Sequence, residues 1–355
     1  MKVIFFLHEI QHYRIPIFRL IAKKIDLTLC TNKKDQIKKY ENECFSVEYL
    51  PIKKLGPFLI HSKNIYKIAR NFDVTVGLMN LRCIDIVLMP LNPFLKTKII
   101  FWGIGVSASY NRNFDVDNRL DFLRFWLFEK ANALLFYTDY PIKKYAKNKV
   151  SKAKMFVANN TVEVLPTNNN NDTSRKDILF IGSLYAEKGI NYLLEAYLEA
   201  YNTVGSCLNR LVIIGDGKEY YNVQKFIDQH KLQEKIVLEG AIYDQKILKE
   251  YFLNSIVSIS PKQAGLSVLM SMGYGVCFIT SKNAITGGEI LNIDHGKTGL
   301  FYKDKKELIS YLIDVYRKPE KFVNIGRSAK NYYDSERQPS QMADGIINAI
   351  KYVIS

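Results

Sequence analysis

Ionisable side chains gather directly after the first apolar stretch of the chain. His8, Glu9, His12 and Arg14 follow Met1–Leu7, which is predicted to be a buried strand. In an open α/β sheet, ligands bind beyond the carboxyl ends of the strands, so these side chains are expected to face a ligand. A histidine titrates near neutral pH, which makes His12 a candidate general base.

The string HEIQH at residues 8–12 also fits the His-Glu-x-x-His pattern of zinc proteases. In those enzymes both histidines lie on one helix. Here a predicted strand ends at Leu7 and Pro16 follows closely, which argues against a helix through the string. We therefore expect a loop at this position rather than a zinc site.

Glycines mark a second set of positions, at the turns where predicted strands pass into helices. They are Gly182, Gly215, Gly265 and Gly288. Glycine lets the backbone turn tightly or approach a ligand closely, and the first N–H groups of a helix attract an anion. The turn from Gly265 to Ser267 would suit a phosphate group, although the same residues could simply cap a helix.

The elements that must position these residues alternate between strands and helices. In the first half, the predicted strands are Met1–Leu7, Asp26–Cys30, Phe45–Leu50, Val74–Leu78, Lys98–Trp102 and Ala133–Phe136, and the helices are Ile15–Ile25, Ile60–Arg70 and Arg119–Ala131. In the second half, the strands are Asp177–Ile181, Arg210–Ile214, Ile236–Glu239, Ile256–Ser260 and Val276–Thr280, and the helices are Asn191–Tyr201, Tyr220–His230, Gln245–Phe252, Gly265–Gly273, Lys305–Arg317 and Gln341–Val353. This alternation indicates parallel βαβ units.

A polar segment separates the two halves. Leu165–Lys176 is rich in asparagine, which favours turns and cannot build a core. We predict a first Rossmann-like domain over residues 1–164, a linker over 165–176 and a second Rossmann-like domain over 177–335. A C-terminal helix within 336–355 is expected to pack back on the first domain.

Charge and cysteine content narrow the class of protein. The 355 residues carry a formal net charge of +15, which favours an anionic partner. Five cysteines without a Cys-x-x-Cys pair argue against a disulfide framework and fit a cytoplasmic location. The first apolar run is too short for a signal peptide, and no run is long enough to span a bilayer. Any membrane role is therefore expected to be peripheral.

Lysines at 143, 144, 147, 149, 152 and 154 form a run without an intervening acid. They follow an aromatic helix that includes Phe122, Phe125, Trp126 and Phe128. Such a pair of segments could dock on an anionic membrane surface. A solvated basic face beside a core helix is the alternative, and for the aromatic side chains alone it is preferred. No recognised nucleic-acid motif accompanies the charge, so nucleic acid is not an expected partner.

Five segments of the second half carry a resemblance to a known family. They are IGSLYAEKG at Ile181–Gly189, IIGDG at Ile213–Gly217, LEGAIYDQKILKEYFLNS at Leu238–Ser255, SPKQAGLSVLMSMGYGVCFIT at Ser260–Thr280 and TGGEILNIDHGKTGLFY at Thr286–Tyr302. In this order they resemble the nucleotide-sugar domain of family 4 glycosyltransferases. YRIPIFRLI, FWGIG and ANNTVEV are weaker similarities in the first half. The resemblance implies the GT-B architecture, in which two Rossmann-like domains face each other across a cleft.

The resemblance also implies roles for individual residues. Lys188 is the expected cation beside the departing diphosphate. The other expected donor contacts are Gly182, Ser183, Gly215, Ala241, Gly265, Leu266, Ser267 and Glu289. Glu289 could bind the ribose or could only be a favourable acid in the first turn of a helix. On the acceptor side we expect His12 as general base and His8 and Arg14 as binding residues.

Two positions depart from the family pattern. Family 4 members usually carry a Glu-x7-Glu pair, and here Gln263 and Met270 stand in those places. An amide can still form hydrogen bonds, so we predict a catalytic role for Gln263, whereas a thioether is only a weak acceptor. Ser183 stands where the family commonly has arginine.

The resemblance therefore implies a glycosyltransferase that retains the anomeric configuration, and we expect it to need no metal. A nucleotide sugar is the expected donor, and a saccharide or lipid-linked acceptor of cell-surface polysaccharide synthesis is the expected second substrate. The expected location is the cytoplasm or the inner face of the cell membrane. The alternative is a degenerate protein that binds a nucleotide sugar or glycan without catalysis, which the changes at Gln263 and Met270 favour.

Overall fold

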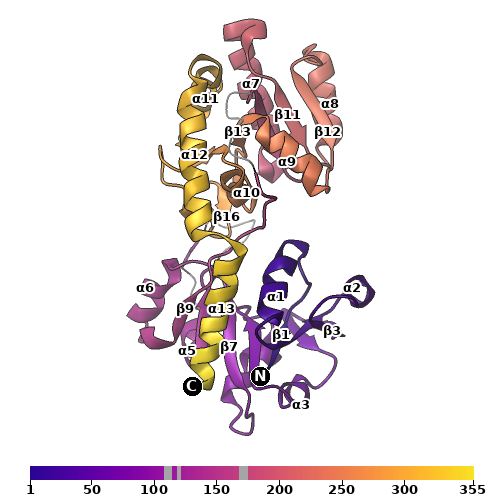
Figure 1. The fold of residues 1–355 in the computed structure, drawn as a ribbon, viewed down its shortest axis with the longest axis vertical. Helices are drawn as coiled ribbons and strands as arrows, with labels where there is room; N and C mark the ends of the chain where they lie inside the picture. Colours follow the sequence, from indigo (N-terminus) through magenta and orange to yellow (C-terminus); the bar gives the residue numbers. More distant parts are fainter. Residues whose placement is uncertain (108–113, 118–120, 168–174) are drawn as a thin grey trace. The chain divides into compact units, whose positions relative to one another are not determined.

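The computed structural model describes residues 1–107, 114–117, 121–167 and 175–355. The chain forms two compact units, each built on one parallel sheet (Figure 1). Unit 1 comprises Met1–Ser107, Asp115–Thr161 and Gln338–Ser355, and unit 2 is built on Val162–Arg337. The predicted α/β class with two Rossmann-like domains is confirmed. Residues 168–174 of the predicted linker and residues 119–120 of the predicted aromatic helix lie outside the described residues.

Unit 1 contains a seven-stranded sheet in the order β3-β2-β1-β6-β7-β8-β9. Its strands are β1 (Lys2–Phe6), β2 (Asp26–Thr31), β3 (Ser46–Tyr49), β6 (Val74–Leu78), β7 (Lys98–Gly103), β8 (Ala133–Phe136) and β9 (Met155–Val157), and a separate hairpin pairs β4 (Ile52–Leu55) with β5 (Phe58–His61). Its helices are α1 (Ile15–Ala22), α2 (Asp35–Lys39), α3 (Ile65–Ala69), α4 (Ile84–Val87), α5 (Asp121–Glu129), α6 (Tyr140–Lys147) and α13 (Pro339–Ile354), with 3-10 turns at His12–Arg14, Met89–Leu91 and Lys152–Lys154.

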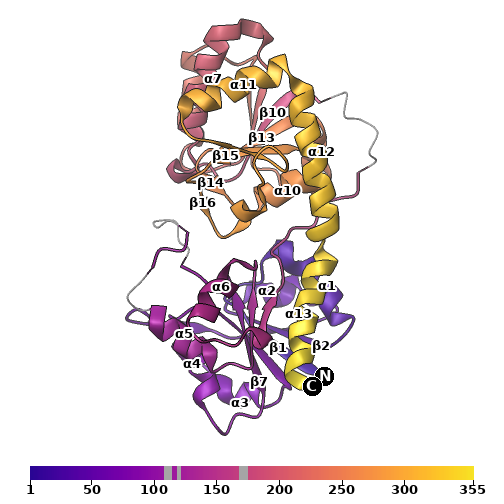
Figure 2. The same ribbon diagram turned by 90° about the vertical axis from the view of Figure 1, so that its left-hand side faces the viewer.

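Both faces of this sheet are covered, which explains why its central strands are apolar throughout. One core joins the sheet to α1 and to α13, which packs against α1. The other core joins it to α4, α5 and α6. Figure 2 shows α4 and α5 on one side of the sheet and α1 and α13 on the other. The last helix of the chain is thus part of unit 1.

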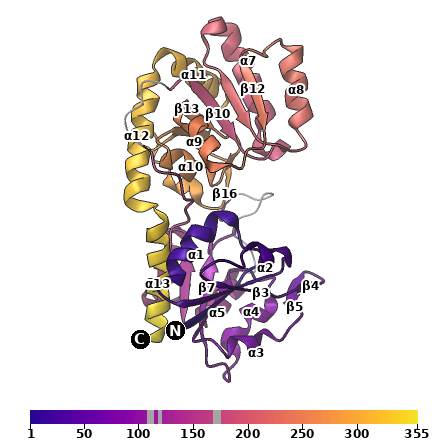
Figure 3. The same ribbon diagram turned by 45° about the vertical axis from the view of Figure 1, so that its right-hand side comes forward.

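The hairpin β4–β5 was not expected from the sequence. The predicted helix at Ile60–Arg70 begins only at Ile65, and its first residues belong to β5. The hairpin turns at Gly56, whose φ of 57° suits glycine, and it lies beside β3 and α4 (Figure 3). Because most of its side chains are exposed, the segment lacks the apolar alternation that would have marked it as strands.

Unit 2 contains a six-stranded parallel sheet in the order β12-β11-β10-β13-β15-β17. Its strands are β10 (Asp177–Ile181), β11 (Leu211–Ile214), β12 (Ile236–Gly240), β13 (Ser255–Ile259), β15 (Cys277–Ser281) and β17 (Leu300–Tyr302), with a short ladder between β14 (Gln263–Ala264) and β16 (Ile285–Thr286). Its helices are α7 (Ile190–Val204), α8 (Tyr220–Gln229), α9 (Gln245–Leu253), α10 (Ser267–Gly273), α11 (Lys305–Arg317) and α12 (Pro319–Glu336), with 3-10 turns at Ala186–Lys188, Gly205–Cys207 and Glu289–Asn292.

Each sheet has a point at which the strand order reverses. In unit 2 the chain runs outward from β10 to β12 and then returns to the other side of β10 with β13. In unit 1 the reversal lies between β1 and β6. Ligands of open α/β sheets bind in the crevice at such a reversal, beyond the carboxyl ends of the strands. Within the described ranges, no helix is both long and apolar enough to cross a bilayer.

Candidate functional site

The strand reversal of unit 2 brings two of the predicted segments side by side. β10 and β13 are hydrogen-bonded neighbours, so the loops that follow them leave the sheet together. The backbone N–H of Lys262 donates to the carbonyl of Lys188 over 3.2 Å, which joins the two loops. A third loop joins them, because Gln263 and Ala264 pair with Ile285 and Thr286 in the β14–β16 ladder.

The side chain of Lys188 folds back over the end of β10. A Cβ placed on Gly182 would lie 3.1 Å from the Lys188 Nζ, so the ammonium group sits directly against this glycine. The lysine is half-buried. Burial lowers its pKa to about 8. In the part of the chain that the structure describes, its ammonium group has no hydrogen-bond or ion-pair partner within the protein.

Gln263, at the position of a family acid, is held by a residue that sequence analysis did not select. The phenol of Tyr185 lies 2.5 Å from the Gln263 Oε1 and can donate to it. Tyr185 belongs to the loop after β10, whereas Gln263 belongs to the loop after β13. When the phenol donates to the oxygen of the amide, the NH2 group of Gln263 remains able to donate elsewhere.

The start of α10 offers free space and an unused hydroxyl group. A Cβ on Gly265 would meet no atom within 4 Å, so packing within the described protein does not require glycine there. The Ser267 Oγ is buried and has no hydrogen-bond partner among the residues that the structure describes. Leu269 and Met272 are fully buried, so this side of α10 belongs to the core of unit 2. Leu266, just before the helix, is half-buried.

Packing inside unit 2 requires a glycine at position 215, whether or not Gly215 contacts a ligand. Its φ is 158°, and a Cβ at this position would lie 2.0 Å from the carbonyl oxygen of Gly182. Any side chain would therefore push β10 and β11 apart at their carboxyl ends. The glycine is explained by this close approach of two backbones, and its contact with a donor stays a prediction.

Glu289 also forms hydrogen bonds within its own loop. Its carboxylate is buried and accepts a hydrogen bond from the backbone N–H of Gly287 over 2.9 Å. Thr286 lies within 3.4 Å of the same oxygen, and its hydroxyl accepts from the backbone N–H of Gly288. The glutamate thus stabilises the glycine turn, and ribose binding by Glu289 stays a prediction.

The remaining donor-side positions differ in exposure. Ser183 and Ala241 are exposed, and Ser183 cannot supply the positive charge of the arginine that the family commonly has at its position. Met270 is half-buried and packs against a small core together with Val164 and Ile181. Its thioether therefore contributes to packing within unit 2.

The acceptor-side candidates lie at the strand reversal of unit 1. The His8 Nε2 is 3.3 Å from the Sγ of Cys83, a residue that follows β6. Burial, with the nearby His61 and Arg82, lowers the pKa of His8 below its usual value. His61 is almost fully buried, and its Nδ1 lies 2.9 Å from the Oδ2 of Asp85. Sequence analysis did not single out Cys83, His61 or Asp85, which become neighbours of His8 only through the fold.

His12 and Arg14 differ in accessibility. His12 is exposed, with its ring against Tyr13. Arg14 is only 8% exposed and donates to the Tyr137 hydroxyl over 2.6 Å, with its guanidinium carbon 4.4 Å from the centroid of the Trp102 ring. The guanidinium group has internal partners, so an acceptor contact by Arg14 stays a prediction, as do the roles of His8 and His12.

No described group of three or more histidine, cysteine or carboxylate side chains could hold a metal ion. The HEIQH string is not helical: residues 8–11 form an irregular bend before the turn at His12–Arg14. Asp115 and Asp117 form an Asp-x-Asp pair that sequence analysis overlooked. Both carboxylates lie within 2.7 Å of the Lys144 Nζ, which neutralises them within unit 1.

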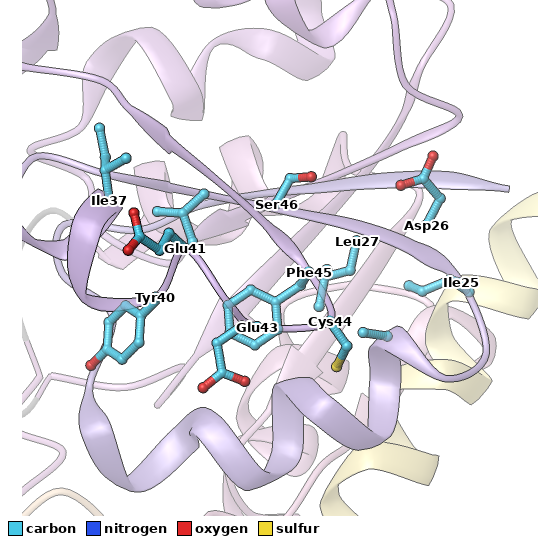
Figure 4. A pocket seen from close by; sticks show the side chains of 12 residues that line it. Ile25, Asp26, Leu27, Ile37, Tyr40, Glu41, Glu43, Cys44, Phe45 and Ser46 are labelled. Carbon is cyan, nitrogen blue, oxygen red and sulfur yellow. The ribbon is translucent and has the colours of Figure 1, made fainter.

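A cavity of about 650 Å³ opens elsewhere in unit 1 (Figure 4). Its lining includes Asp26 and Ser46, the first residues of β2 and β3, together with Glu41 and Glu43. It therefore lies at the amino ends of the strands, the opposite edge of the sheet from His8. Its acidic lining also disfavours an anionic ligand, so we do not assign it to the site.

In unit 2, the arrangement around Lys188 can bind a negatively charged group. It combines an unpaired cation, an unpartnered serine hydroxyl and an amide that can donate a hydrogen bond, all beyond the carboxyl ends of β10 and β13. Phosphate oxygens accept hydrogen bonds from each of these groups. The geometry thus fits a phosphorylated ligand at the strand reversal.

Comparisons with known proteins match a part of the chain to one family and one curated relative. Residues 161–332 match the family model described as "Glycosyl transferases group 1". A 157-residue stretch is 24% identical to the alpha-monoglucosyldiacylglycerol synthase of Acholeplasma laidlawii and covers 43% of this chain. That stretch spans only 37% of the length of the synthase.

Solved structures match over nearly the whole chain. Anabaena Alr3699/HepE, solved with UDP, has a TM-score of 0.73 at 11% identity and covers 99% of this chain and 100% of its own. The same protein was also solved with UDP-glucose. A glycosyltransferase from Rickettsia africae has a TM-score of 0.73 at 13% identity, covering 100% of this chain and 98% of its own. At such identities the matches establish the fold, which is that of GT-B glycosyltransferases.

Proposed function

We propose, on the premise that residues 161–332 belong to the group 1 glycosyltransferases, that this protein transfers a hexose from a nucleotide sugar to a saccharide or lipid-linked acceptor. The unpaired Lys188 ammonium at the strand reversal of unit 2 is the observation that carries the proposal. A half-buried cation with no partner among the described residues is costly in the free protein, and an anionic ligand would remove that cost. The diphosphate of a nucleotide sugar is such a ligand.

The neighbouring groups suit a departing nucleoside diphosphate. Negative charge grows on the diphosphate as the bond to the sugar breaks, so groups that attract it lower the barrier. Lys188 would supply the charge, and Ser267 and Gln263 would supply hydrogen bonds. UDP and UDP-glucose occupy the structurally similar HepE, which supports a uridine nucleotide as the first donor to test.

The finer features of the reaction follow from the family resemblance. We propose that the anomeric configuration is retained, with the departing phosphate assisting deprotonation of the acceptor. No carboxylate nucleophile is then needed, which agrees with an amide at Gln263. We further propose a role in cell-surface polysaccharide synthesis at the inner face of the cell membrane.

A thermal-shift panel of nucleoside diphosphates and nucleotide sugars is the first test, because a ligand that binds the native state raises its melting temperature. Release of nucleoside diphosphate is then measured with and without candidate acceptors. Binding with acceptor-dependent release supports the transferase. Binding without release under any acceptor favours a non-catalytic binding protein, and no stabilisation by any nucleotide contradicts both.

Donor affinity is expected to fall as the pH rises through about 8, the pKa of Lys188. Only the protonated amine attracts the diphosphate, so binding is strongest below this pH and weakens above it. A bound anion favours the charged form, so the pKa is higher in the complex. Calorimetric titration of the donor on both sides of this pH checks the prediction, and a flat profile would show that Lys188 does not contact the ligand.

Turnover is expected to continue in the presence of a chelator. Lys188 can offset the diphosphate charge without a metal, and Lys144 already neutralises Asp115 and Asp117. The measurement is the rate of diphosphate release in EDTA, with magnesium or manganese restored afterwards. Loss of activity in EDTA that either metal reverses would contradict the prediction.

A further inference from the structure

One face of unit 1 exposes large apolar side chains. α4, α5 and α6 lie on the same side of the sheet, because they connect β6 to β7, β7 to β8 and β8 to β9 in one direction (Figure 2). This side, which we call the α4–α5 face, carries five exposed apolar residues. They are Phe94, Phe122, Trp126, Leu91 and Leu88, with exposed fractions of 78%, 69%, 50%, 40% and 37%.

The outer side of α5 is apolar without being part of the core. Phe122 and Trp126 lie one helical turn apart and point outward, whereas Phe125 and Phe128 are buried against the sheet. Only two of the four aromatic residues of this helix therefore belong to the core. Contiguous exposed aromatic groups on a protein surface mark a site of interaction.

Lysines surround this apolar surface. Lys96 follows Phe94 and is exposed, and the Lys130 Nζ lies 6.0 Å from the centroid of the Trp126 ring. α6 packs beside α5, with the rings of Phe125 and Tyr145 4.9 Å apart. On α6, Lys143 and Lys147 are exposed.

The predicted lysine run divides into two groups. Lys144 binds Asp115, Asp117 and Asp121, and Lys154 binds Glu129, so these two lysines serve the fold. Lys143, Lys147, Lys149 and Lys152 are exposed and form no ion pair within the described ranges. Of these available cations, Lys143 and Lys147 lie on α6, the helix that packs beside α5.

We propose that the α4–α5 face docks unit 1 on an anionic membrane surface. Tryptophan, phenylalanine and leucine side chains on the apolar face of an interfacial helix insert at the boundary between lipid headgroups and acyl chains. The neighbouring lysines would be attracted to anionic headgroups at the same time. A second copy of the chain fits less well, because the lysines of the two copies would repel each other. This inference does not rest on the proposed sugar transfer.

The test measures sedimentation of the full chain with vesicles of phosphatidylcholine, with and without phosphatidylglycerol. One variant combines Phe122→Ser with Trp126→Ser, and another combines Lys143→Glu with Lys147→Glu. The control combines Tyr221→Ser with Lys225→Glu, which changes an exposed aromatic and an exposed lysine of α8 in unit 2. Melting temperatures establish that each variant is folded.

Binding to the anionic vesicles is expected to fall roughly tenfold or more in both unit 1 variants and to stay unchanged in the control, since each surface lysine alone contributes about fivefold. Added salt should weaken wild-type binding. Equal binding to both kinds of vesicle, or unchanged binding by the unit 1 variants, would overturn the proposal. The proposal would also be overturned if the protein formed a dimer that dissociates in the Phe122→Ser, Trp126→Ser variant, because the α4–α5 face would then bind a second copy of the chain. Thermal shifts with UDP in the same variants report on the donor site separately.

Discussion

Lys188→Met is expected to lower turnover about 10²–10³-fold, the usual loss when one group that stabilises transition-state charge is removed. Methionine fills much of the volume of the lysine stem and removes only the charge. The ammonium group lies against Gly182 at the end of β10, where the proposed diphosphate would bind. It should interact more strongly with the departing diphosphate than with the intact donor, so turnover should suffer more than donor affinity.

The same substitution is expected to raise the stability of the ligand-free protein. The pKa of Lys188 in the folded chain is about 8, below the usual value of 10.5, so folding disfavours the charged form. Below pH 8 the amine is charged in both states, so the full penalty is present at neutral pH, and it fades only as the pH rises from about 8 toward 10.5. Replacing the amine by a neutral group removes this penalty. A merely structural lysine would behave in the opposite way, with stability and activity falling together.

Lys225→Met on α8 is the matched control, because Lys225 is exposed on a helix that begins after β11. It should change neither turnover nor the melting temperature. The measurements are steady-state kinetics and thermal unfolding with and without donor. If Lys188→Met left the kinetics unchanged in a folded protein, Lys188 would have no place in the donor site, and the proposed function would lose its main support.

The fold was largely predictable because its signals are local. Central strands such as Val74–Leu78 and Ala133–Phe136 are short apolar runs, and the structure has them with the predicted bounds. The helix at Lys305–Arg317 also agrees, since Asp304 caps its start and apolar residues recur at helical spacing. The hairpin β4–β5 was missed for the complementary reason, because most of its side chains are exposed and the few that are covered do not alternate with polar ones.

The candidate site was only partly predictable because its contacts join distant segments. Lys188 and Gln263 could be selected one at a time, but their proximity depends on β10 and β13 being neighbours, and periodicity does not reveal strand order. Tyr185 was missed for this reason. Gly215 illustrates the reverse case: the glycine was noticed, but the carbonyl of Gly182 that requires it is visible only in the structure.

Gln263→Ala is expected to lower turnover by about 10- to 100-fold, which corresponds to losing one hydrogen bond to a charged group of ~1.5–3 kcal/mol. Gln263 is half-buried in β14, beyond the carboxyl end of β13, and its amide oxygen already has the phenol of Tyr185 as a partner. Its NH2 group would therefore be directed toward the leaving phosphate or a sugar hydroxyl. The melting temperature should change little compared with turnover. Gln263→Glu should be less active than wild type, because a carboxylate cannot donate this hydrogen bond and would repel the phosphate.

Tyr185 should act through Gln263, and a double-mutant cycle tests this. Tyr185→Phe removes the hydroxyl that lies 2.5 Å from the Gln263 Oε1 and keeps the ring. If the phenol only orients the amide, Tyr185→Phe should lower turnover in the wild-type background and have almost no further effect in Gln263→Ala. Additive losses would show that Tyr185 contacts the substrate independently. Unchanged turnover in both single variants, with the donor still bound, would instead indicate that the amide at position 263 has no part in catalysis.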